Sequence, residues 1–293
     1  MTYLLHIFIL IGIYVIVAQS LNLISGYTGL LSIAHAGFYG IGAYVAALMV
    51  LHFHTNFLLN MACAAVLAGL LGFVVAIPSL RLHGDYFVIA TFAFQIIAFS
   101  IMNNWVSVTA GPLGLPGIPR PEILGFTFTT HVHFLALVGF FAVLTFLFLN
   151  RLVRSPYGRV LRAIREDEVF SQSLGKNVTH FKVSVFIIGA AIASIGGALY
   201  AHYITFIDPT SFTINESIFI LAIVIIGGSG NLIGSIVGAT VLIMVPEFLR
   251  FVGMPSSVAA NMRQILYGGL LVLFMMFMPE GFVGEYAFKK GER

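Results

Sequence analysis

The chain has 293 residues, of which 59% are hydrophobic and 9% are charged, and its formal net charge is +3. A soluble globular domain carries about 25% charged residues, so a chain this poor in charge cannot cover a water-facing surface and must use lipid as its solvent. The single cysteine, Cys63, excludes an intramolecular disulfide and a disulfide-rich ectodomain. We therefore expect a membrane protein.

Long uncharged segments begin at the N-terminus, and residues 1–80 contain no Lys, Arg, Asp or Glu. They suit helices of about 20 apolar residues better than the short alternating strands of an outer-membrane barrel. The first segment has no basic stretch and stays apolar beyond signal-peptide length, so we expect a retained span. Hydropathy predicts spans near residues 4–25, 30–50, 57–78, 84–102, 134–150, 183–204, 214–227, 232–250 and 263–278. The predicted fold class is an all-α polytopic membrane protein with about eight to ten transmembrane or re-entrant helices, in one domain covering residues 1–293.

Two long polar interruptions, 103–133 and 151–182, divide the predicted spans. Seven of the fourteen Lys and Arg residues lie in 151–182, and three more, Lys289, Lys290 and Arg293, lie in the C-terminal tail. The positive-inside rule places both segments in the cytoplasm, and counting spans backwards places the N-terminus and 103–133 outside. Because 103–133 is rich in Gly and Pro, we expect a folded external lid there rather than a helix.

Two glycine-rich breaks resemble each other: GYTGLLSIAHAG at 26–37 and GGSGNLIGSIVG at 227–238. Each interrupts an apolar span, and Gly29 and Gly37 are separated like Gly230 and Gly238. Paired glycine-interrupted spans in the two halves of a transporter indicate its substrate path. Small residues also serve close packing in membrane helices. An internal repeat and simple packing therefore both stay open.

Catalytic and cofactor-binding motifs are scarce. The sequence has no HExxH or GxSxG, and LGKN at 174–177 lacks the first glycine and the Ser/Thr of a phosphate-binding loop. We therefore expect neither enzymatic activity nor a cofactor in this chain. The pairs His52/His54 and His131/His133 have no Cys, Asp or Glu beside them, which favours interfacial histidines over a metal site.

Ionisable residues within spans would indicate an ion-driven carrier. His35 lies in the broken segment SIAHAGFYG, and a packed, hydrogen-bonded histidine is favoured over a pathway residue. The acidic residues that we expect at span ends are Asp85, Asp208, Glu216, Glu247 and Glu280. This placement disfavours ion coupling, so a transport path in this chain would either conduct passively or take energy from another subunit.

The charged stretch RSPYGRVLRAIREDEVFSQSLG, residues 154–175, predicts a short amphipathic helix. Ser155 suits the N-cap, Pro156 the first helical position and Gly175 the position after the end. Apolar residues follow helical spacing at Tyr157, Val160, Leu161 and Ile164, and another face carries Arg159, Arg162 and Glu166. A solvated loop would explain the arginines but not the acidic cluster or the paired caps. We therefore favour a helix that docks on a cytoplasmic partner.

Seven motifs follow one another along nearly the whole chain: SLNLISGYTGLLSIAHAGFYGIGAY (20–44), RLHGDYFVIATFAF (81–94), GPLGLPGIP (111–119), YGRVLRAIREDEVFSQSLGKNVTHFKVSVF (157–186), GGALYAHYITFIDPTSF (196–212), IIGGSGNLIGSIVGA (225–239) and MPEGFVG (278–284). With these motifs the chain resembles permease subunits of ABC importers for branched-chain amino acids, of the LivM type. The resemblance implies uptake of leucine, isoleucine and valine across the bacterial inner membrane. It implies a homologous second permease, two cytoplasmic ATP-binding subunits and an external substrate-binding protein as partners, besides membrane lipid, and no nucleic acid.

The resemblance also implies functional residues. An ATPase-coupling motif would include Arg165, Glu166, Asp167, Glu168 and Gly175, and Arg159 and Arg162 complete the predicted coupling helix at 156–174. Val169-Phe170-Ser171-Gln172 stands where the family usually has small residues, which leaves the contact register open. The implied translocation pathway includes Ser32, His35, Gly37, Gly228, Ser229 and Asn231.

Other substrates and mechanisms stay open. Permeases for urea, short amides or other amino acids are similar in sequence, so the transported molecule is not fixed by the motifs. An ion-coupled secondary carrier is the alternative from a different class.

Overall fold

The computed structural model describes residues 2–80, 84–123, 125–251, 268–269, 272–273, 276–277 and 281–283. Most of the last predicted span, 263–278, lies outside the described residues. So do Glu280, the basic C-terminal tail and residues 81–83, at the start of the RLHGDYF motif.

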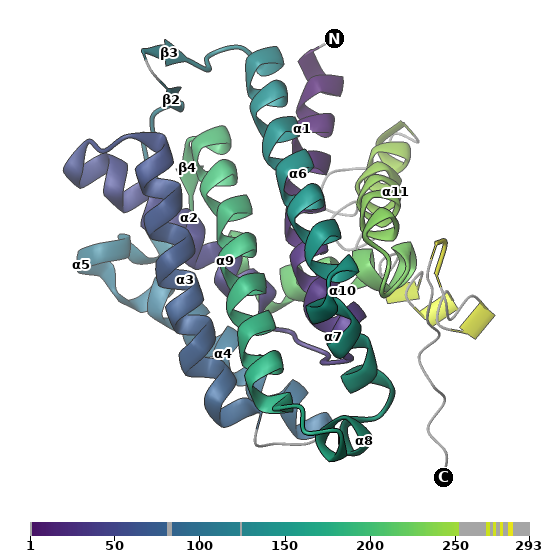
Figure 1. The fold of residues 1–293 in the computed structure, drawn as a ribbon. Helices are drawn as coiled ribbons and strands as arrows, with labels where there is room; N and C mark the ends of the chain where they lie inside the picture. The colour runs from purple at the N-terminus through teal and green to yellow at the C-terminus, as the bar shows by residue number, and fades with distance from the viewer. Residues whose placement is uncertain are drawn as a thin grey trace.

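Among the described residues, six helices are long and apolar enough to cross a membrane. They are α1 with its π-helical extension (Thr2–Gly26), α2 (His35–Phe53), α3 (Phe57–Ser79), α4 (Asp85–Asn104), α6 (His131–Arg154) and α9 (Val178–Ile204). Two further helices, α10 (Ile214–Gly227) and α11 (Leu232–Phe251), form a pair bent by 119° at the glycine-rich break between them. The all-α polytopic class is therefore confirmed (Figure 1).

The predicted second span, 30–50, is wrong at its start. Residues 29–34 are not helical, and α2 begins only at His35. Gly29 has a φ of 74°, which a right-handed helix cannot contain, and the Ile33 N–H donates to the Thr91 hydroxyl of α4 at 3.2 Å. The chain can leave the helix inside the bundle because side chains from other helices satisfy its backbone.

Three helices form the centre of the bundle. More than half of the most apolar part of α1, α2 and α9 is buried, against about a third in α3, α4 and α6. The outer helices expose large apolar side chains such as Leu70, Ile97 and Phe140, as expected where a surface faces lipid. α2 and α9 approach closely because they meet at glycine: a Cβ on Gly197 would lie 1.9 Å from the Tyr39 carbonyl oxygen.

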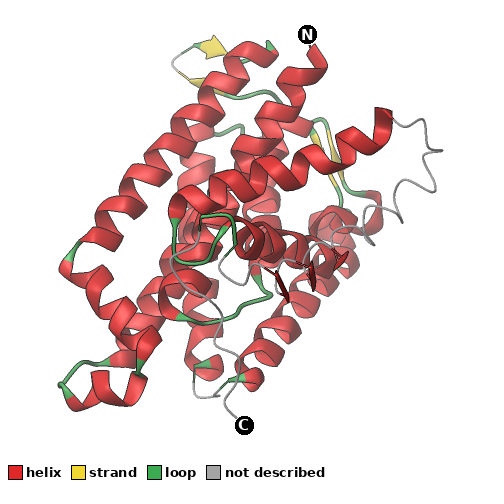
Figure 2. Cartoon of the chain, turned by 90° about the vertical axis from the view of Figure 1, so that its right-hand side faces the viewer, coloured by secondary structure: helices red, strands yellow, loops and turns green. Residues whose placement is uncertain are grey.

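The two ends of the bundle differ. One end carries the N-terminus and the two-residue strands β2 (Glu122–Ile123) and β3 (Phe126–Thr127), and the other carries α7 (Pro156–Glu166) and α8 (Glu168–Ser173) (Figure 1). We refer to them as the β2–β3 end and the α7–α8 end. Figure 2 shows how far helix predominates in the described chain.

The Gly/Pro-rich segment 103–133 holds only short elements between α4 and α6. They are α5 (Val106–Thr109), the 3₁₀ turn η2 (Gly111–Leu113), β1 (Leu115–Pro116), β2 and β3. β1 pairs antiparallel with β4 (Phe206–Ile207), which follows α9, and the 3₁₀ turn η3 (Pro209–Phe212) follows β4. The segment is thus a folded loop tied to the end of α9.

Candidate functional site

The charged stretch forms two helices, and the predicted single helix at 156–174 is wrong. α7 ends at Glu166, and Asp167 is extended at φ −152° and ψ 109°. The Asp167 carboxylate accepts a hydrogen bond of 2.9 Å from the Phe170 N–H and so caps α8. The acidic cluster therefore ends one helix and starts the next. Aspartate is favoured at the N-cap, where its carboxylate accepts from the free N–H groups of the first turn, and is disfavoured in a helix interior.

The predicted termini of this region are confirmed in position. Ser155 is the N-cap residue and Pro156 the first helical residue, although the Ser155 hydroxyl donates to the Leu152 carbonyl and does not cap α7. Gly175 follows α8 with a φ of 77°, its N–H donates to the Gln172 carbonyl at 2.8 Å, and the Lys176 N–H donates to the Ser171 carbonyl at 3.2 Å. This is the Schellman arrangement, which favours glycine.

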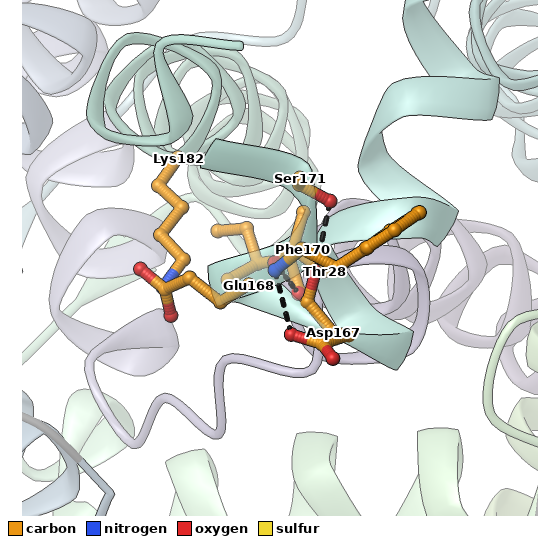
Figure 3. Close-up of polar contacts among 7 residues, drawn as sticks. Thr28, Asp167, Glu168, Phe170, Ser171 and Lys182 are labelled. Atoms are coloured by element: carbon orange, nitrogen blue, oxygen red, sulfur yellow. Dashed lines mark hydrogen bonds and ion pairs between the residues drawn. The ribbon is translucent and has the colours of Figure 1, made fainter. Parts of the chain in front are cut away.

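Side chains fix α7 and α8 against α9. Lys182 of α9 forms an ion pair of 2.5 Å with Glu168, as Figure 3 shows beside the Asp167 cap. The Tyr157 hydroxyl lies within hydrogen-bond distance of Ser184 and of the Phe181 carbonyl. Burial raises the pKa of Tyr157, against a smaller opposing effect of the Ser184 hydrogen bond, so its hydroxyl stays protonated at neutral pH. The two short helices are thus attached to a spanning helix.

Two of the predicted coupling arginines reach the first glycine break. Arg165 Nη1 donates to the carbonyl oxygen of Gly26, 139 residues earlier in the chain. The Arg162 guanidinium lies 5.6 Å from the centre of the Tyr27 ring, a cation–π distance. A cavity of about 330 Å³ lies beside this contact, lined by Thr28, Gly29, Leu30, Leu31, Leu80, Gly84, Asp85, Phe87, Val88, Ile164, Arg165, Glu168 and Lys182. The α7–α8 region therefore contacts the break directly.

Four of the other predicted coupling residues face outward. Arg159, Glu166, Asp167 and Gly175 are exposed. Within the departure from the family pattern at 169–172, Val169 and Phe170 are at least 60% accessible and Ser171 is buried. Leu174, which follows the departure, is at least 60% accessible too. Arg159 and Glu166 thus lie away from the break that Arg162 and Arg165 contact, and the predicted polar face divides into an inner and an outer part.

The two glycine breaks meet, and Asn22 joins them. Its amide nitrogen donates to the Asn231 carbonyl and to the Ser235 hydroxyl, both at 2.8 Å, and its amide oxygen accepts from the Gly230 N–H at 2.9 Å. The contact requires glycine at position 26, because a Cβ there would lie 2.5 Å from the Gly230 nitrogen. Asn22 was missed by sequence reasoning, since an asparagine in an apolar helix carries no spacing signal of its own.

Within the second break, the predicted pathway residues have structural partners. Gly228 ends α10, with its N–H donating to the Val224 carbonyl at 3.0 Å, and the Asn231 side chain accepts from the Ile233 N–H at 2.9 Å at the start of α11. Ser229 is buried, and its hydroxyl has no hydrogen-bond partner among the described residues. Gly29 and Gly230, the matched positions of the suggested repeat, both have positive φ, at 74° and 83°.

In the first break, Ser32, His35 and Gly37 are all buried at the start of α2. The Gly37 N–H donates to Gln95 Oε1 at 2.6 Å, and Gln95 Nε2 donates to the Phe212 carbonyl at 2.8 Å. The Ser32 hydroxyl accepts from the Ala34 N–H at 3.3 Å. Gln95 thus links α4, α2 and η3 inside the bundle, a role that an isolated glutamine in the sequence did not indicate.

His35 is packed as predicted, but the predicted hydrogen bond is absent from the part of the chain that the structure describes. Its side chain is fully buried, with the ring edge-to-face to Phe38 at 6.3 Å between ring centres. Neither ring nitrogen has a partner among the described residues. A buried imidazole without partners is costly, so this position has unused hydrogen-bonding capacity in the bundle.

Glu216 lies at the end of its helix as predicted, in the first turn of α10, but this end is not at the end of the neighbouring α1. Its carboxylate accepts a hydrogen bond from the Tyr14 hydroxyl, and Tyr14 is the middle residue of the Thr2–Gly26 span. α10 begins inside the bundle, so the first turn of a short apolar helix is not at a membrane surface. The sequence argument against an ion-coupled carrier is weakened accordingly.

A larger cavity, of about 730 Å³, lies at the β2–β3 end. Its lining includes charged and imidazole side chains of Arg120, Glu122, His54 and His202. The Arg120 guanidinium lies over the Tyr203 ring at 5.3 Å, and a His202 ring nitrogen contacts the Pro119 carbonyl at 2.8 Å. Among the described residues, no three His, Cys, Asp or Glu side chains are grouped as for a metal ion.

These features define a class of protein: an α-helical polytopic membrane protein with two glycine-broken helices meeting inside the bundle and a short charged helix pair at one end. Broken helices at membrane depth occur where they are buried in protein or line a solvent-filled cavity, and they are a recurring feature of transporters.

Comparison with known proteins identifies the family. A family model described as "Branched-chain amino acid transport system / permease component" matches residues 3–275, and the chain therefore belongs to this family. The chain is 36% identical to the high-affinity branched-chain amino acid transport system permease protein LivM of Salmonella typhimurium, over 92% of this chain and 67% of the relative. It is 29% identical to a probable LivM of Methanocaldococcus jannaschii, over 94% and 91%. It is 28% identical to LivH of Escherichia coli K12, over 93% and 91%. No solved structure matches this chain.

Family membership confirms the resemblance to LivM-type permeases that the seven motifs indicated. The chain is therefore a membrane transport permease. The relatives are transport permease proteins and not enzymes. Relatives named LivM and LivH both align over more than nine-tenths of this chain, so the two kinds of permease are homologous.

Proposed function

We propose that this chain is the membrane permease subunit of an ATP-driven importer that takes up branched-chain amino acids by alternating access. Membership in the branched-chain amino acid permease family supports the substrate class. The homology to both LivM and LivH supports assembly with a second, homologous permease. Two cytoplasmic ATP-binding subunits and an external binding protein complete the assembly.

The proposed orientation places the α7–α8 end in the cytoplasm and the N-terminus and segment 103–133 outside. The seven Lys and Arg residues of 151–182 support it, because basic loops stay in the cytoplasm. The opposite placement of the β2–β3 end and the α7–α8 end on the bundle is consistent with it (Figure 1). The C-terminus then lies in the cytoplasm of a bacterial inner-membrane protein.

Coupling passes through α7 and α8 in this proposal. The outer surface, with Val169, Phe170 and Leu174 exposed beside Arg159 and Glu166, meets the ATP-binding subunit. The inner surface transmits the movement, and the single observation that carries this step is the hydrogen bond from Arg165 to the Gly26 carbonyl. From Gly26, Asn22 extends the contact to the second break at Gly230 and Asn231. Packed elements move as units between discrete arrangements, so a shift of α7 would be passed to both breaks.

The translocation pathway in this proposal runs along the two breaks, past Ser32, His35 and Gly37 and past Gly228, Ser229 and Asn231. Buried polar groups without partners at His35 and Ser229 support it, since transported polar groups need such partners at membrane depth.

The test is purification of the chain with its native partners and reconstitution into vesicles. Recovery of two ATP-binding subunits and a second permease, with leucine uptake that requires ATP, is the expected result. Uptake by vesicles that contain this chain alone, driven by an ion gradient, would instead identify a secondary carrier. ATP-driven uptake of urea or short amides, without uptake of leucine, would support the proposed mechanism and contradict the proposed substrate.

A further inference from the structure

Glu216 is an acidic side chain at membrane depth. Tyr14, its hydrogen-bond donor, lies about 18 Å from either end of the Thr2–Gly26 span, which is near the middle of a bilayer core. Among the described residues, Glu216 forms no ion pair, and the Tyr14 hydroxyl is its hydrogen-bond partner. Ionisable groups are costly at this depth and are kept where they serve a function.

Aromatic rings from four other elements gather around this carboxylate. Tyr14 of α1 and Tyr39 of α2 have ring centres 6.4 Å apart, and Tyr39 lies 5.5 Å from Tyr200 of α9 and 5.3 Å from Phe212 of η3. Tyr39 and Tyr200 thus belong to the same aromatic cluster as Tyr14, which donates to Glu216. The Tyr39 hydroxyl is buried and has no hydrogen-bond partner among the described residues. The cluster thus offers a carboxylate, an unused hydroxyl and several ring faces.

These groups suit an organic ammonium. Its N–H donors pair with a carboxylate and with hydroxyl oxygens, and its charge is attracted to aromatic faces. A bare inorganic cation would instead require several oxygen ligands. The Glu216 residue as a whole is half-buried.

We propose that Glu216, with Tyr14, Tyr39 and Tyr200, binds the α-ammonium group of the amino acid during its passage. This inference rests on the proposed function and adds the group that distinguishes an amino acid from other small branched molecules. α1, α2, α9 and α10 all contribute to the site, so occupation by an ammonium group would bring these helices together. The subsite lies beside the pathway residues, because Ser217, the neighbour of Glu216, accepts from the Ala36 N–H at 2.9 Å at the start of α2.

The test compares L-leucine with its 2-hydroxy acid analogue, in which a hydroxyl replaces the ammonium group. Direct binding of each labelled compound is measured on the purified complex of permeases and ATP-binding subunits. We expect Glu216→Gln to weaken leucine binding by about 10-fold to 100-fold, the value of one hydrogen bond to a charged group, and to change binding of the hydroxy acid by less than about threefold. Asn104→Ala, at an exposed position at the end of α4 outside both described cavities, serves as the control and should leave both affinities unchanged.

A charge-conserving variant separates recognition from folding. Glu216→Asp keeps the carboxylate, so we expect it to retain the preference for leucine over the hydroxy acid even if both bind less tightly. Unchanged leucine affinity in Glu216→Gln, or loss of the preference in Glu216→Asp, overturns the proposal. Wild-type uptake that requires an inward proton gradient would assign the carboxylate to a proton and also overturn it. ATP-driven leucine uptake by the wild-type complex tests the proposed function separately. A wrong subsite can therefore be distinguished from a wrong function.

Discussion

At the residue scale, two side chains hold the candidate site together, and neither acts on a substrate in the structure. Asn22 satisfies backbone groups of a break more than 200 residues away, and Arg165 satisfies the carbonyl of Gly26 in the other break. A helix break inside a bundle leaves N–H and C=O groups without their helical partners, and water is scarce there to replace them. Polar side chains from other elements therefore determine whether such breaks are stable.

Asn22→Ala should destabilise the protein. The substitution leaves the buried Gly230 N–H and the Asn231 carbonyl without their partner, at a cost of about 1–3 kcal/mol for each unsatisfied group. The thermal inactivation midpoint of the purified complex measures this effect. Asn104→Ala, at an exposed position at the end of α4, is the control, and an equal midpoint for both variants would contradict the prediction.

Arg165→Ala should uncouple uptake from ATP hydrolysis. We expect leucine uptake to fall by about tenfold or more while ATP hydrolysis by the complex continues, because a hydrogen bond from a charged group is worth about 1.5–3 kcal/mol. Uptake and hydrolysis are measured in the same vesicles. The matched substitution is Arg154→Ala, an exposed arginine in the last turn of α6. Normal uptake by the Arg165 variant would show that the contact with Gly26 transmits nothing.

At the element scale, the charged region is a pair of short helices whose ends are fixed individually. Asp167 caps α8, Glu168 pairs with Lys182, and Gly175 ends the pair in a left-handed conformation. The Lys182–Glu168 pair is only partly exposed, with 12% of the lysine side chain and 36% of the glutamate side chain accessible. Together these interactions orient the apolar surface of α8 away from the bundle, so the geometry of the region depends on its turns.

Substitutions at Gly175 should follow the backbone conformation. Proline fixes φ near −65°, which is incompatible with 77°, and it also removes the N–H that donates to Gln172. We expect Gly175→Pro to abolish uptake while the protein still inserts into the membrane, and Gly175→Asn to retain most of it, because asparagine tolerates the left-handed region. Uptake and the amount of membrane-inserted protein are measured together.

Gly139 in α6 provides the control for this series, because nothing lies within 4 Å of a Cβ placed there and its φ is not positive. Gly139→Ala should be neutral or slightly stabilising. Full uptake by Gly175→Pro would mean that the turn after α8 has no part in coupling.

At the scale of the whole molecule, the bundle separates a charged helix pair at one end from a folded loop at the other, with the broken helices between them (Figure 1). The buried α1, α2 and α9 form the centre, and α3, α4 and α6 present apolar side chains outward. In this arrangement Glu216 contacts the middle residue of the Thr2–Gly26 span, although it stands at the beginning of an apolar segment in the sequence. The proposed function requires the two ends to face opposite sides of the membrane.

Cysteine labelling tests that orientation. In a Cys63→Ala background, Thr127→Cys in β3 and Lys176→Cys after α8 place exposed thiols at the two ends of the bundle (Figure 1). A membrane-impermeant thiol reagent added to intact cells should label the first variant, and the second only after lysis. The reverse pattern would invert the proposed topology.

Much of the fold is predictable because a helix that spans the lipid bilayer needs a continuous segment of about 20 apolar residues. The starts and ends of α3 and α4 follow, within about two residues, from where long segments of high hydropathy begin and end. The cap position of Ser155 and the terminating role of Gly175 follow from local backbone preferences. The start of α2 was misplaced because residues 30–34 are as apolar as a helix, and only side chains from other helices allow them to leave it.

The sequence by itself determined the membrane class, the approximate positions of most of the described spanning helices, the presence of two glycine breaks and the charged region at 151–182, because each depends on a continuous segment and its solvent. The tertiary structure decided that the breaks meet through Asn22, that Arg165 contacts one of them and that Tyr14 of α1 contacts Glu216. These facts depend on contacts between residues 139 to 208 positions apart, and hydropathy and local spacing hold no information about which distant segments pack together.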